Sequence, residues 1–286
     1  VKHDVDLNHL EQSLNAIILQ HDVLRLSFKQ VKQQWCQSHN EVELVGIERV
    51  DLSHDESDLK QIIETHIANT QQSLSLQQAP LLKCVYFKTP QLDQHRLFLT
   101  VHHLVIDGIS WRILLEDFER AYAQLSAGSP VELGRKTTSY QRWSEALTAY
   151  AQNITTETEY WHHIVQHPIT PVLPDIIGGN NEVSMSHTIS TTVDSKTTER
   201  LLKQCNQAYR TEINDILLTA LATTFCQWLG SDSVLIDLEG HGREAIDDVI
   251  DVSRTMGWFT TVFPVLLKTA SSPEKQIKCI KQSLRD

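Results

Sequence analysis

Residues 96–125 read RLFLTVHHLVIDGISWRILLEDFERAYAQL, and the rest of the chain can be placed around them. Residues 97–102 alternate in the period of a β-strand. Asp107-Gly108 is a turn signal, and Ser110 is a residue type that caps helix N-termini. Apolar residues then recur at helical spacing to the end of the stretch. The stretch therefore predicts a strand, a turn and a long amphipathic helix.

Two adjacent histidines, His102 and His103, stand at the end of the predicted strand. Neighbouring residues of a strand point to opposite faces, so the two imidazoles cannot share one role. We expect one of them to pack and the other to face a cleft. From the residues alone, a buried histidine hydrogen-bonded in the turn is the more common case. A metal site built on His103 and Asp107 lacks an evident third ligand.

Charge and cysteine content exclude several classes of protein. The 286 residues include 25 Lys and Arg against 36 Asp and Glu, a net charge of -11. No basic cluster stands out, which argues against nucleic acid and anionic membranes as partners. No apolar run reaches the roughly 18 residues of a membrane helix. The five cysteines are scattered without a CxxC pair, which is typical of reduced thiols and predicts a cytoplasmic protein.

Predicted helices and strands are mixed along the chain without a sequence repeat, which indicates an α/β (α+β) protein. Residues 166–182 hold three prolines and two glycines and form the best linker in the chain. We therefore expect an N-terminal lobe at 1–165 and a C-terminal lobe at 183–286. The second lobe is expected to open with an alternating strand at 183–189. Neither lobe carries a glycine-rich phosphate loop.

A second polar cluster follows a predicted strand at 233–239. The strand ends on Glu239 and runs into GHGRE at 240–244. A carboxylate at the end of a buried strand, beside glycines that let the backbone approach a ligand, suits an acid or a base. A solvated charge cluster at a strand-end turn explains the spacing equally well. Further on, residues 254–261 place tryptophan and phenylalanine beside glycine, which builds either a cleft wall or core.

One motif points to a known superfamily. Residues 102–108, HHLVIDG, match the HHxxxDG motif of the condensation-domain superfamily of nonribosomal peptide synthetases. Residues 20–28, QHDVLRLSF, resemble the RHxxLRxxF segment of that superfamily, with Gln20 in place of the usual arginine. These two segments identify the superfamily and no particular branch of it.

Four further runs are similar to the epimerization branch. They are DGISW at 107–111, NDILLTA at 214–220, EGHGRE at 239–244 and RTMGWFT at 254–260, where a methionine replaces the branch's valine. The last two runs are far more specific than HHxxxDG. The chain therefore resembles an epimerization domain of a nonribosomal peptide synthetase.

The resemblance implies a two-lobed, V-shaped fold like that of chloramphenicol acetyltransferase. It also implies that the sequence is incomplete at both ends, with a truncated C-terminal lobe. The family's opening segment with proline, glutamine and tryptophan is absent before Val1. Its lobe-bridging crossover and final strands are absent after Lys268. We expect these absences to weaken the isolated chain.

Such domains convert the α-carbon of an aminoacyl or peptidyl thioester from L to D. The thioester is carried on the phosphopantetheine arm of a peptidyl carrier protein. The resemblance therefore implies an isomerase of antibiotic biosynthesis and secondary metabolism that supplies D-amino acids. It implies no cofactor of the chain's own, and it implies a carrier domain and neighbouring synthetase modules as partners.

The resemblance also assigns roles to residues. His103 and Glu239 form the acid–base pair, one from each lobe, and which of them removes the L-proton is open. Asp107 is expected to form a buried ion pair with Arg254 or Arg25. The residues expected to shape or orient the site are His102, Asp107, Gly108 and Arg254. The residues expected to line the path of the substrate or the arm are Ser110, His241 and Trp258. No metal is implied.

Two other functions fit the same fold. A condensation domain would form peptide bonds with the same HHxxxDG motif. A non-catalytic carrier-docking module, or an inactive remnant, would bind the carrier protein without chemistry. The EGHGRE and RTMGWFT runs favour epimerization over condensation.

Overall fold

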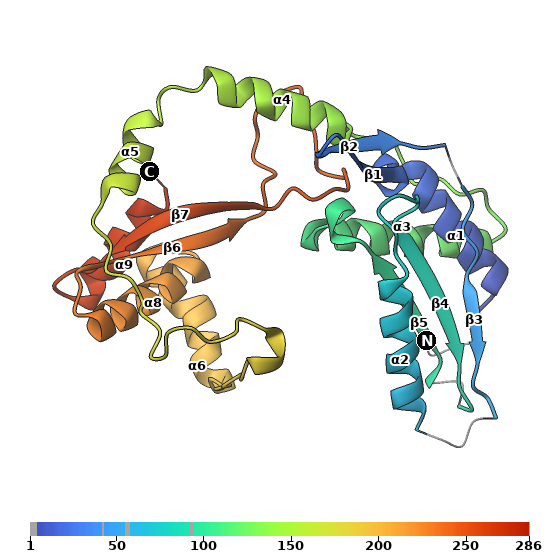
Figure 1. The fold of residues 1–286 in the computed structure, drawn as a ribbon, viewed down its shortest axis with the longest axis horizontal. Coiled ribbons are helices and arrows are strands. Elements are labelled where there is room, and N and C mark those ends of the chain that lie inside the picture. Colours follow the sequence, from blue (N-terminus) through green and yellow to red (C-terminus); the bar gives the residue numbers. More distant parts are fainter. Residues whose placement is uncertain (1–4, 42, 55–57, 92–93, 286) are drawn as a thin grey trace. The chain divides into compact units, whose positions relative to one another are not determined.

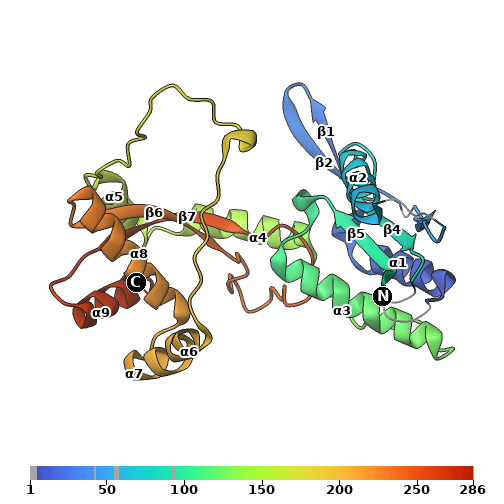
Figure 2. The same ribbon diagram turned by 90° about the horizontal axis from the view of Figure 1, so that it is seen from below.

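The computed structural model describes residues 5–41, 43–54, 58–91 and 94–285. Helices and strands are mixed along the chain, as an α/β (α+β) protein requires, and Figures 1 and 2 show them from two directions. Within these residues, no helix is both long enough and apolar enough to cross a membrane.

The chain divides into two compact units. They are Val1–Ile154 with His241–Thr261 for the first unit, and Thr155–Gly240 with Val262–Asp286 for the second. This division differs from the expected lobes in two places. Residues 155–165 fall in the second unit, and residues 241–261 return to the first. The chain therefore passes between the units three times, where a single linker at 166–182 was expected to join two lobes.

The first unit opens with α1 (Leu7–Gln20), whose N-cap is Asp6. The Asp6 carboxylate accepts two backbone N–H groups of the first turn, at 2.8 and 3.1 Å. A 3₁₀ turn, η1 (Asp22–Arg25), leads into β1 (Leu26–Val31). β1 pairs with β2 (Gln34–His39) in an antiparallel hairpin.

A three-stranded sheet forms the centre of the first unit. Its middle strand, β4 (Leu82–Lys88), runs parallel to β3 (Glu48–Asp51) and antiparallel to β5 (Arg96–Val101). Nearly all of β4 is buried because helices cover both of its faces. On one face lies α2 (Leu59–Gln72), and on the other lies the core shared with α1. The strand predicted from residues 97–102 is present, but it ends at Val101, so both histidines lie beyond it.

A 3₁₀ turn, η3 (His103–Val105), joins β5 to the long helix α3 (Gly108–Ser126). The prediction that Ser110 caps this helix is wrong. Asp107 is the N-cap, and its carboxylate accepts the Ser110 N–H at 2.7 Å. Ser110 is already the third helical residue, on the face that packs inward. Met256, from the returning segment, joins the core between α1 and α3.

The returning segment, residues 241–261, is irregular up to its last residue and is held by packing against α4 (Tyr140–Asn153). Trp143 of α4 forms a cluster with Val252 and Phe259 of the segment. The first unit is therefore built from two pieces of chain that lie almost ninety residues apart in the sequence.

The second unit has a two-stranded sheet with helices packed on it (Figure 2). Its elements are α5 (Thr158–Gln166), α6 (Ser195–Glu199), the π-helical turn η5 (Arg200–Cys205), α7 (Asn206–Tyr209), α8 (Ile213–Leu229), β6 (Ser233–Gly240), β7 (Thr261–Lys268) and α9 (Pro273–Ser283). Gly230, at a φ of 62°, ends α8, and Ser272 caps α9.

The strand predicted at 183–189 is wrong. Val183–Met185 form one 3₁₀ turn, and the residues after it lie extended and exposed, with Ile189 89% accessible. Alternation supplies a strand-like pattern, but a strand also needs a neighbour for its backbone N–H and C=O groups. In the described part of the chain no strand pairs with this segment.

Candidate active site

The two histidines of the HHLVIDG run occupy different environments. His102 is half-buried, and its Nδ1 accepts the Leu104 N–H at 3.2 Å. Burial, together with the charge of His103, lowers the pKa of His102 below its ordinary value. His102 is therefore favoured in its neutral form, as a hydrogen-bond acceptor within the turn. His103 is the exposed member of the pair.

The His103 ring lies beside the indole of Trp258. Their ring centroids are 5.2 Å apart and their planes are tilted by 57°. Trp258 is 42% exposed, so both rings present surface to solvent. The structure thus brings together two of the predicted site residues that are 155 positions apart in the sequence.

The turn that carries His103 is fixed by the buried carboxylate of Asp107, which is 4% exposed. One oxygen accepts the Ser110 N–H at 2.7 Å, and the other accepts the Phe259 N–H at 3.2 Å. The guanidinium of Arg243 lies 3.3 Å from the first oxygen. The carboxylate therefore caps α3 and anchors the returning segment at the same time.

Arg243 is the arginine that pairs with Asp107, and the expected partners are wrong. Its Nη2 also donates to Ser110 Oγ at 2.9 Å. Its Nη1 donates to the carbonyls of Val252 and Thr255 at 2.9 and 2.8 Å, and the Phe259 ring lies 3.9 Å from the guanidinium carbon. Burial lowers the pKa of Arg243, and the charge of Asp107 opposes that shift.

The two arginines that were expected have other partners. Arg254 binds Asp117 at 2.6 Å and Glu116 at 3.0 Å, both on α3. Arg25 binds Asp22 at 2.8 Å and the carbonyl at the end of α1 at 2.6 Å. Arg254 is therefore bound to α3 and not to Asp107, and its orienting role stays a prediction. The one feature of the sequence that could have pointed to Arg243 as the partner of Asp107 is its position within the EGHGRE run.

The structure contradicts the expectation that Ser110 lines a path for substrate. Its side chain is fully buried, with 0% exposure. Ser110 Oγ donates to the Gly257 carbonyl at 3.0 Å and accepts the Gly257 N–H at 3.1 Å. Because Ser110 is on the inner face of α3, its hydroxyl binds the backbone of the 256–259 segment. A ligand cannot reach it. The Ser110 N–H, taken by Asp107, is closed to a ligand as well.

Gly108 differs from Ser110 in being exposed. It is the first residue of α3, and a Cβ placed there would meet no atom within 4 Å. The positive end of a helix dipole favours negative charge at this position. A role for Gly108 beside a developing enolate stays a prediction.

The glycine of the EGHGRE run that lies in the first unit, Gly242, has a role that differs from the expected one. Its φ is 64°, and a Cβ there would collide with the Phe259 carbonyl. A Cβ on Gly257 would collide with the ring of Tyr140. Both glycines therefore allow chain segments of the protein to approach each other, and neither is required by a ligand in this arrangement.

The unit boundary falls inside the EGHGRE run. Glu239 lies at the end of β6 in the second unit and is exposed, on the face opposite Val234, Ile236 and Leu238. His241, in the first unit, is exposed and its Nδ1 accepts the Arg243 N–H at 3.0 Å. Three residues separate Glu239 from the anchored Arg243 in the sequence.

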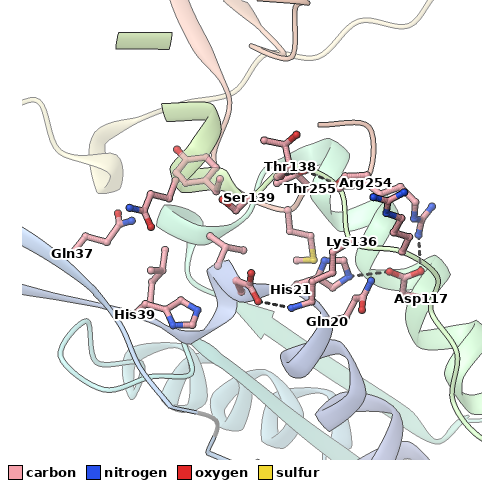
Figure 3. A pocket seen from close by; sticks show the side chains of 18 residues that line it. Gln20, His21, Gln37, His39, Asp117, Lys136, Thr138, Ser139, Arg254 and Thr255 are labelled. Atoms are coloured by element: carbon pink, nitrogen blue, oxygen red, sulfur yellow. Dashed lines mark hydrogen bonds and ion pairs between the residues drawn. The ribbon is translucent and has the colours of Figure 1, made fainter. Parts of the chain in front are cut away.

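A cavity of about 640 Å³ lies elsewhere in the first unit (Figure 3). The end of α1, η1, β2, residues 135–141 and residues 254–256 surround it. His21 Nε2 lies 2.9 Å from Asp117, which also binds Arg254. Burial opposes ionisation of Asp117, but the His21 hydrogen bond and the Arg254 charge outweigh it and lower the pKa of Asp117. Neither His103 nor Trp258 lines this cavity.

No group of three or more His, Cys, Asp or Glu side chains suited to a metal occurs among the residues that the structure describes. The turn at His103–Val105 and its surroundings offer the imidazole of His103, the indole of Trp258 and the start of α3. That set can transfer a proton and contact an apolar or thioester group, and it can place a positive dipole end near developing negative charge.

Comparison with known families gives one match along the whole chain. The Condensation domain family matches residues 1–286. Gramicidin S synthase 1 of Brevibacillus brevis is 38% identical over 287 residues, which cover 98% of this chain and 26% of that protein. Surfactin synthase subunit 1 of Bacillus subtilis is 36% identical over 291 residues, covering 99% of this chain and 8% of that protein.

Solved structures show the same fold. The epimerization domain from the third module of tyrocidine synthetase B superposes with a TM-score of 0.89 at 35% identity, over 99% of this chain and 64% of that one. The first condensation domain of the calcium-dependent antibiotic synthetase has a TM-score of 0.71 at 18% identity, over 100% of this chain and 67% of that one. The chain thus spans about two thirds of these domains and a small part of the synthases.

Proposed function

This chain belongs to the Condensation domain family, and we propose that it is an epimerization domain of a nonribosomal peptide synthetase. Its reaction would convert the α-carbon of an aminoacyl or peptidyl thioester from L to D. The thioester would be presented on the phosphopantetheine arm of a peptidyl carrier protein. Neighbouring synthetase modules would supply and receive the peptide, in the cytoplasm.

One observation carries the choice of epimerization. The exposed His103 is held in place by Arg243, through Asp107, and lies against Trp258. Arg243 comes from the EGHGRE run and Trp258 from the RTMGWFT run, the two runs most typical of the epimerization branch. The branch-specific residues therefore contact the histidine turn directly. The 35% identity to an epimerization domain supports the same choice.

The chemistry requires two proton-transfer groups and a place for negative charge. The α-proton of a thioester is a weak acid, so a base must remove it and an acid must return a proton to the opposite face. We assign these roles to His103 and Glu239, one from each unit. One positioned acid–base group contributes about 10²–10⁴-fold to such a reaction. We propose that the start of α3, at Gly108, stabilises the negative charge that develops on the enolate oxygen.

The remaining predicted residues keep proposed roles that their contacts support. His102 and Asp107 hold the turn, and Arg254 fixes α3. Trp258, and the exposed His241, are proposed to contact the substrate or the arm. Proton transfer of this kind needs no organic cofactor and no metal of the domain's own.

The test is the reaction itself, carried out with the complete domain that contains this chain. L-aminoacyl and L-peptidyl carrier proteins are incubated with it in deuterated water, with and without an acceptor carrier. Deuterium at Cα without a new peptide bond supports epimerization. A new peptide bond without deuterium would make the domain a condensation enzyme. Carrier binding with neither product would make it a docking module.

A further inference from the structure

Tyr140, the first residue of α4, lies beside the part of the returning segment that carries Trp258. The residues before it are joined to that segment by hydrogen bonds. Thr138 N–H donates to the Asp251 carbonyl at 2.9 Å, and Thr255 Oγ1 donates to the Thr138 carbonyl at 2.6 Å. The start of α4 is therefore bound to residues 251–255 independently of the contacts that Tyr140 makes.

The Tyr140 side chain contacts three consecutive residues of the segment. Its hydroxyl donates to the Trp258 carbonyl at 2.7 Å. Its ring meets the Phe259 ring edge-on, with centroids 5.1 Å apart, and occupies the space that a side chain on Gly257 would need. A change at Tyr140 therefore acts on the backbone of residues 257–259.

The other side of the same three residues is fixed to α3. Ser110 Oγ bonds both backbone groups of Gly257, and Asp107 accepts the Phe259 N–H. These bonds hold the residues on either side of Trp258. The Trp258 carbonyl accepts the Tyr140 hydroxyl, and the Trp258 ring contacts the His103 ring. Together these contacts fix the backbone at residue 258, from which the indole extends.

We infer that Tyr140 is a positioning residue for His103, acting through the carbonyl and the indole of Trp258. The inference rests on the proposed function, because it assigns His103 to the chemistry. Without the Tyr140 hydroxyl the Trp258 carbonyl loses its partner, and the 258–259 peptide group is held only by the bond from the Phe259 N–H to Asp107. The indole is then held less firmly against the His103 ring. The imidazole then samples orientations other than the one that reaches the substrate.

The hydroxyl is suited to this role over a wide pH range. Burial and the charge of Asp107 raise the pKa of Tyr140, although Arg243 opposes the shift. The phenol therefore stays protonated and remains a donor at every pH at which a histidine titrates. The hydrogen bond from the Tyr140 hydroxyl to the Trp258 carbonyl joins two uncharged groups. Its contribution to free energy is that of an ordinary hydrogen bond.

The test compares Tyr140→Phe with a matched control, Tyr150→Phe, in the complete domain. Tyr150 lies on the same helix and is 45% exposed. The first measurement is the chemical shift of the His103 Cε1–H, assigned by its loss in His103→Ala and sensitive to the Trp258 ring current. In Tyr140→Phe it should move toward its value in Trp258→Ala. In Tyr150→Phe it should not move.

The second measurement is steady-state epimerization. Tyr140→Phe should lower kcat about tenfold and leave KM within about twofold, since the change affects the reacting group and not the binding of the arm. A thermal melt checks that the variant is folded. An unmoved His103 resonance, or a kcat no lower than that of Tyr150→Phe, would overturn the inference. If the unsubstituted domain exchanges no α-proton, the proposed function fails, and the resonance alone then decides the role of Tyr140.

Discussion

The side chains of His103 and Glu239 are exposed, unlike those of Asp107 and Ser110. Asp107 and Ser110 are buried and hydrogen-bonded, so their substitution alters the fold. The side chains of His103 and Glu239 can be changed with little effect on stability, within about 0.5 kcal/mol for surface positions. Loss of activity in these two variants therefore reports on chemistry.

We expect His103→Ala and Glu239→Gln each to lower epimerization by at least about 10²-fold. The measurement is chiral analysis of the product, with circular dichroism to check folding. His162→Ala, an exposed histidine of α5, is the control and should retain full activity. Near-full epimerization by either variant would remove that residue from the proposed pair. Solvent exchange measured separately from L- and D-substrates then shows which group removes the L-proton.

Asp117 makes part of the stability of the first unit dependent on pH. Its pKa in the folded protein is lowered, against an ordinary value of about 3.9 in an unfolded chain. A carboxyl group with a lowered folded pKa stabilises the fold above its unfolded pKa. That stability is lost as the pH falls through the folded value. The loss therefore begins below about pH 5 and continues under pH 4.

Asp117→Asn tests this dependence by urea unfolding at a series of pH values. We expect the wild-type protein to be the more stable at pH 7, because the variant leaves His21 without its carboxylate and Arg254 with only Glu116. The difference in free energy of unfolding should shrink steadily below about pH 5. A difference that stays constant down to pH 3 would contradict the assignment.

Single glycine positions in the returning segment, residues 241–261, determine how closely its backbone packs. Gly242 has a positive φ, and a Cβ there would collide with a carbonyl of a neighbouring stretch of chain. We expect Gly242→Ala to cost at least about 2 kcal/mol, through strain and displacement together. Gly179→Ala is the control, since a Cβ there meets no atom within 4 Å. Chemical unfolding measures both, and equal stability of the two variants would contradict the argument.

Elements whose signals are local could be predicted from the sequence. The helix after Asp107 follows from helical spacing within one stretch of sequence, so no second segment is needed to recognise it. The strand predicted at 183–189 fails because pairing is a property of two segments. The N-cap prediction for α3 fails for a related reason. Asp107 and Ser110 are both residue types that cap helices, and the Ser110 hydroxyl is bonded to Gly257, far away in the sequence.

The candidate site divides in the same way. His103 and Glu239 are singled out by motifs, and their catalytic roles are proposals. The different environments of His102 and His103 arise in the turn after β5, because the strand ends at Val101. The partner of Asp107 could not be found, because Arg25, Arg243 and Arg254 are alike in type, and only packing shows which one reaches the turn. Tyr140 carries no motif, and its role follows from contacts alone.

For the whole molecule, the exposed stretch between α5 and α6 is the least protected part of the chain. Every described residue from 168 to 194 is exposed, including several apolar ones such as Ile177 at 91%. We expect brief digestion with thermolysin to cut first within residues 168–194, because a protease needs extended, accessible backbone. Mass spectrometry locates the cut. A first cut within α3 or β4 would contradict the fold described.

The return of residues 241–261 to the first unit bears on the engineering of hybrid synthetases. A single junction in the exposed linker would join the first piece of one parent to the returning segment of another. Asp107 of the first parent would then face Arg243 of the second, and Tyr140 would face a foreign Trp258. Grafts that keep a parental first unit therefore need three junctions, at residues 154, 240 and 261, so that the exchanged material enters as two inserts.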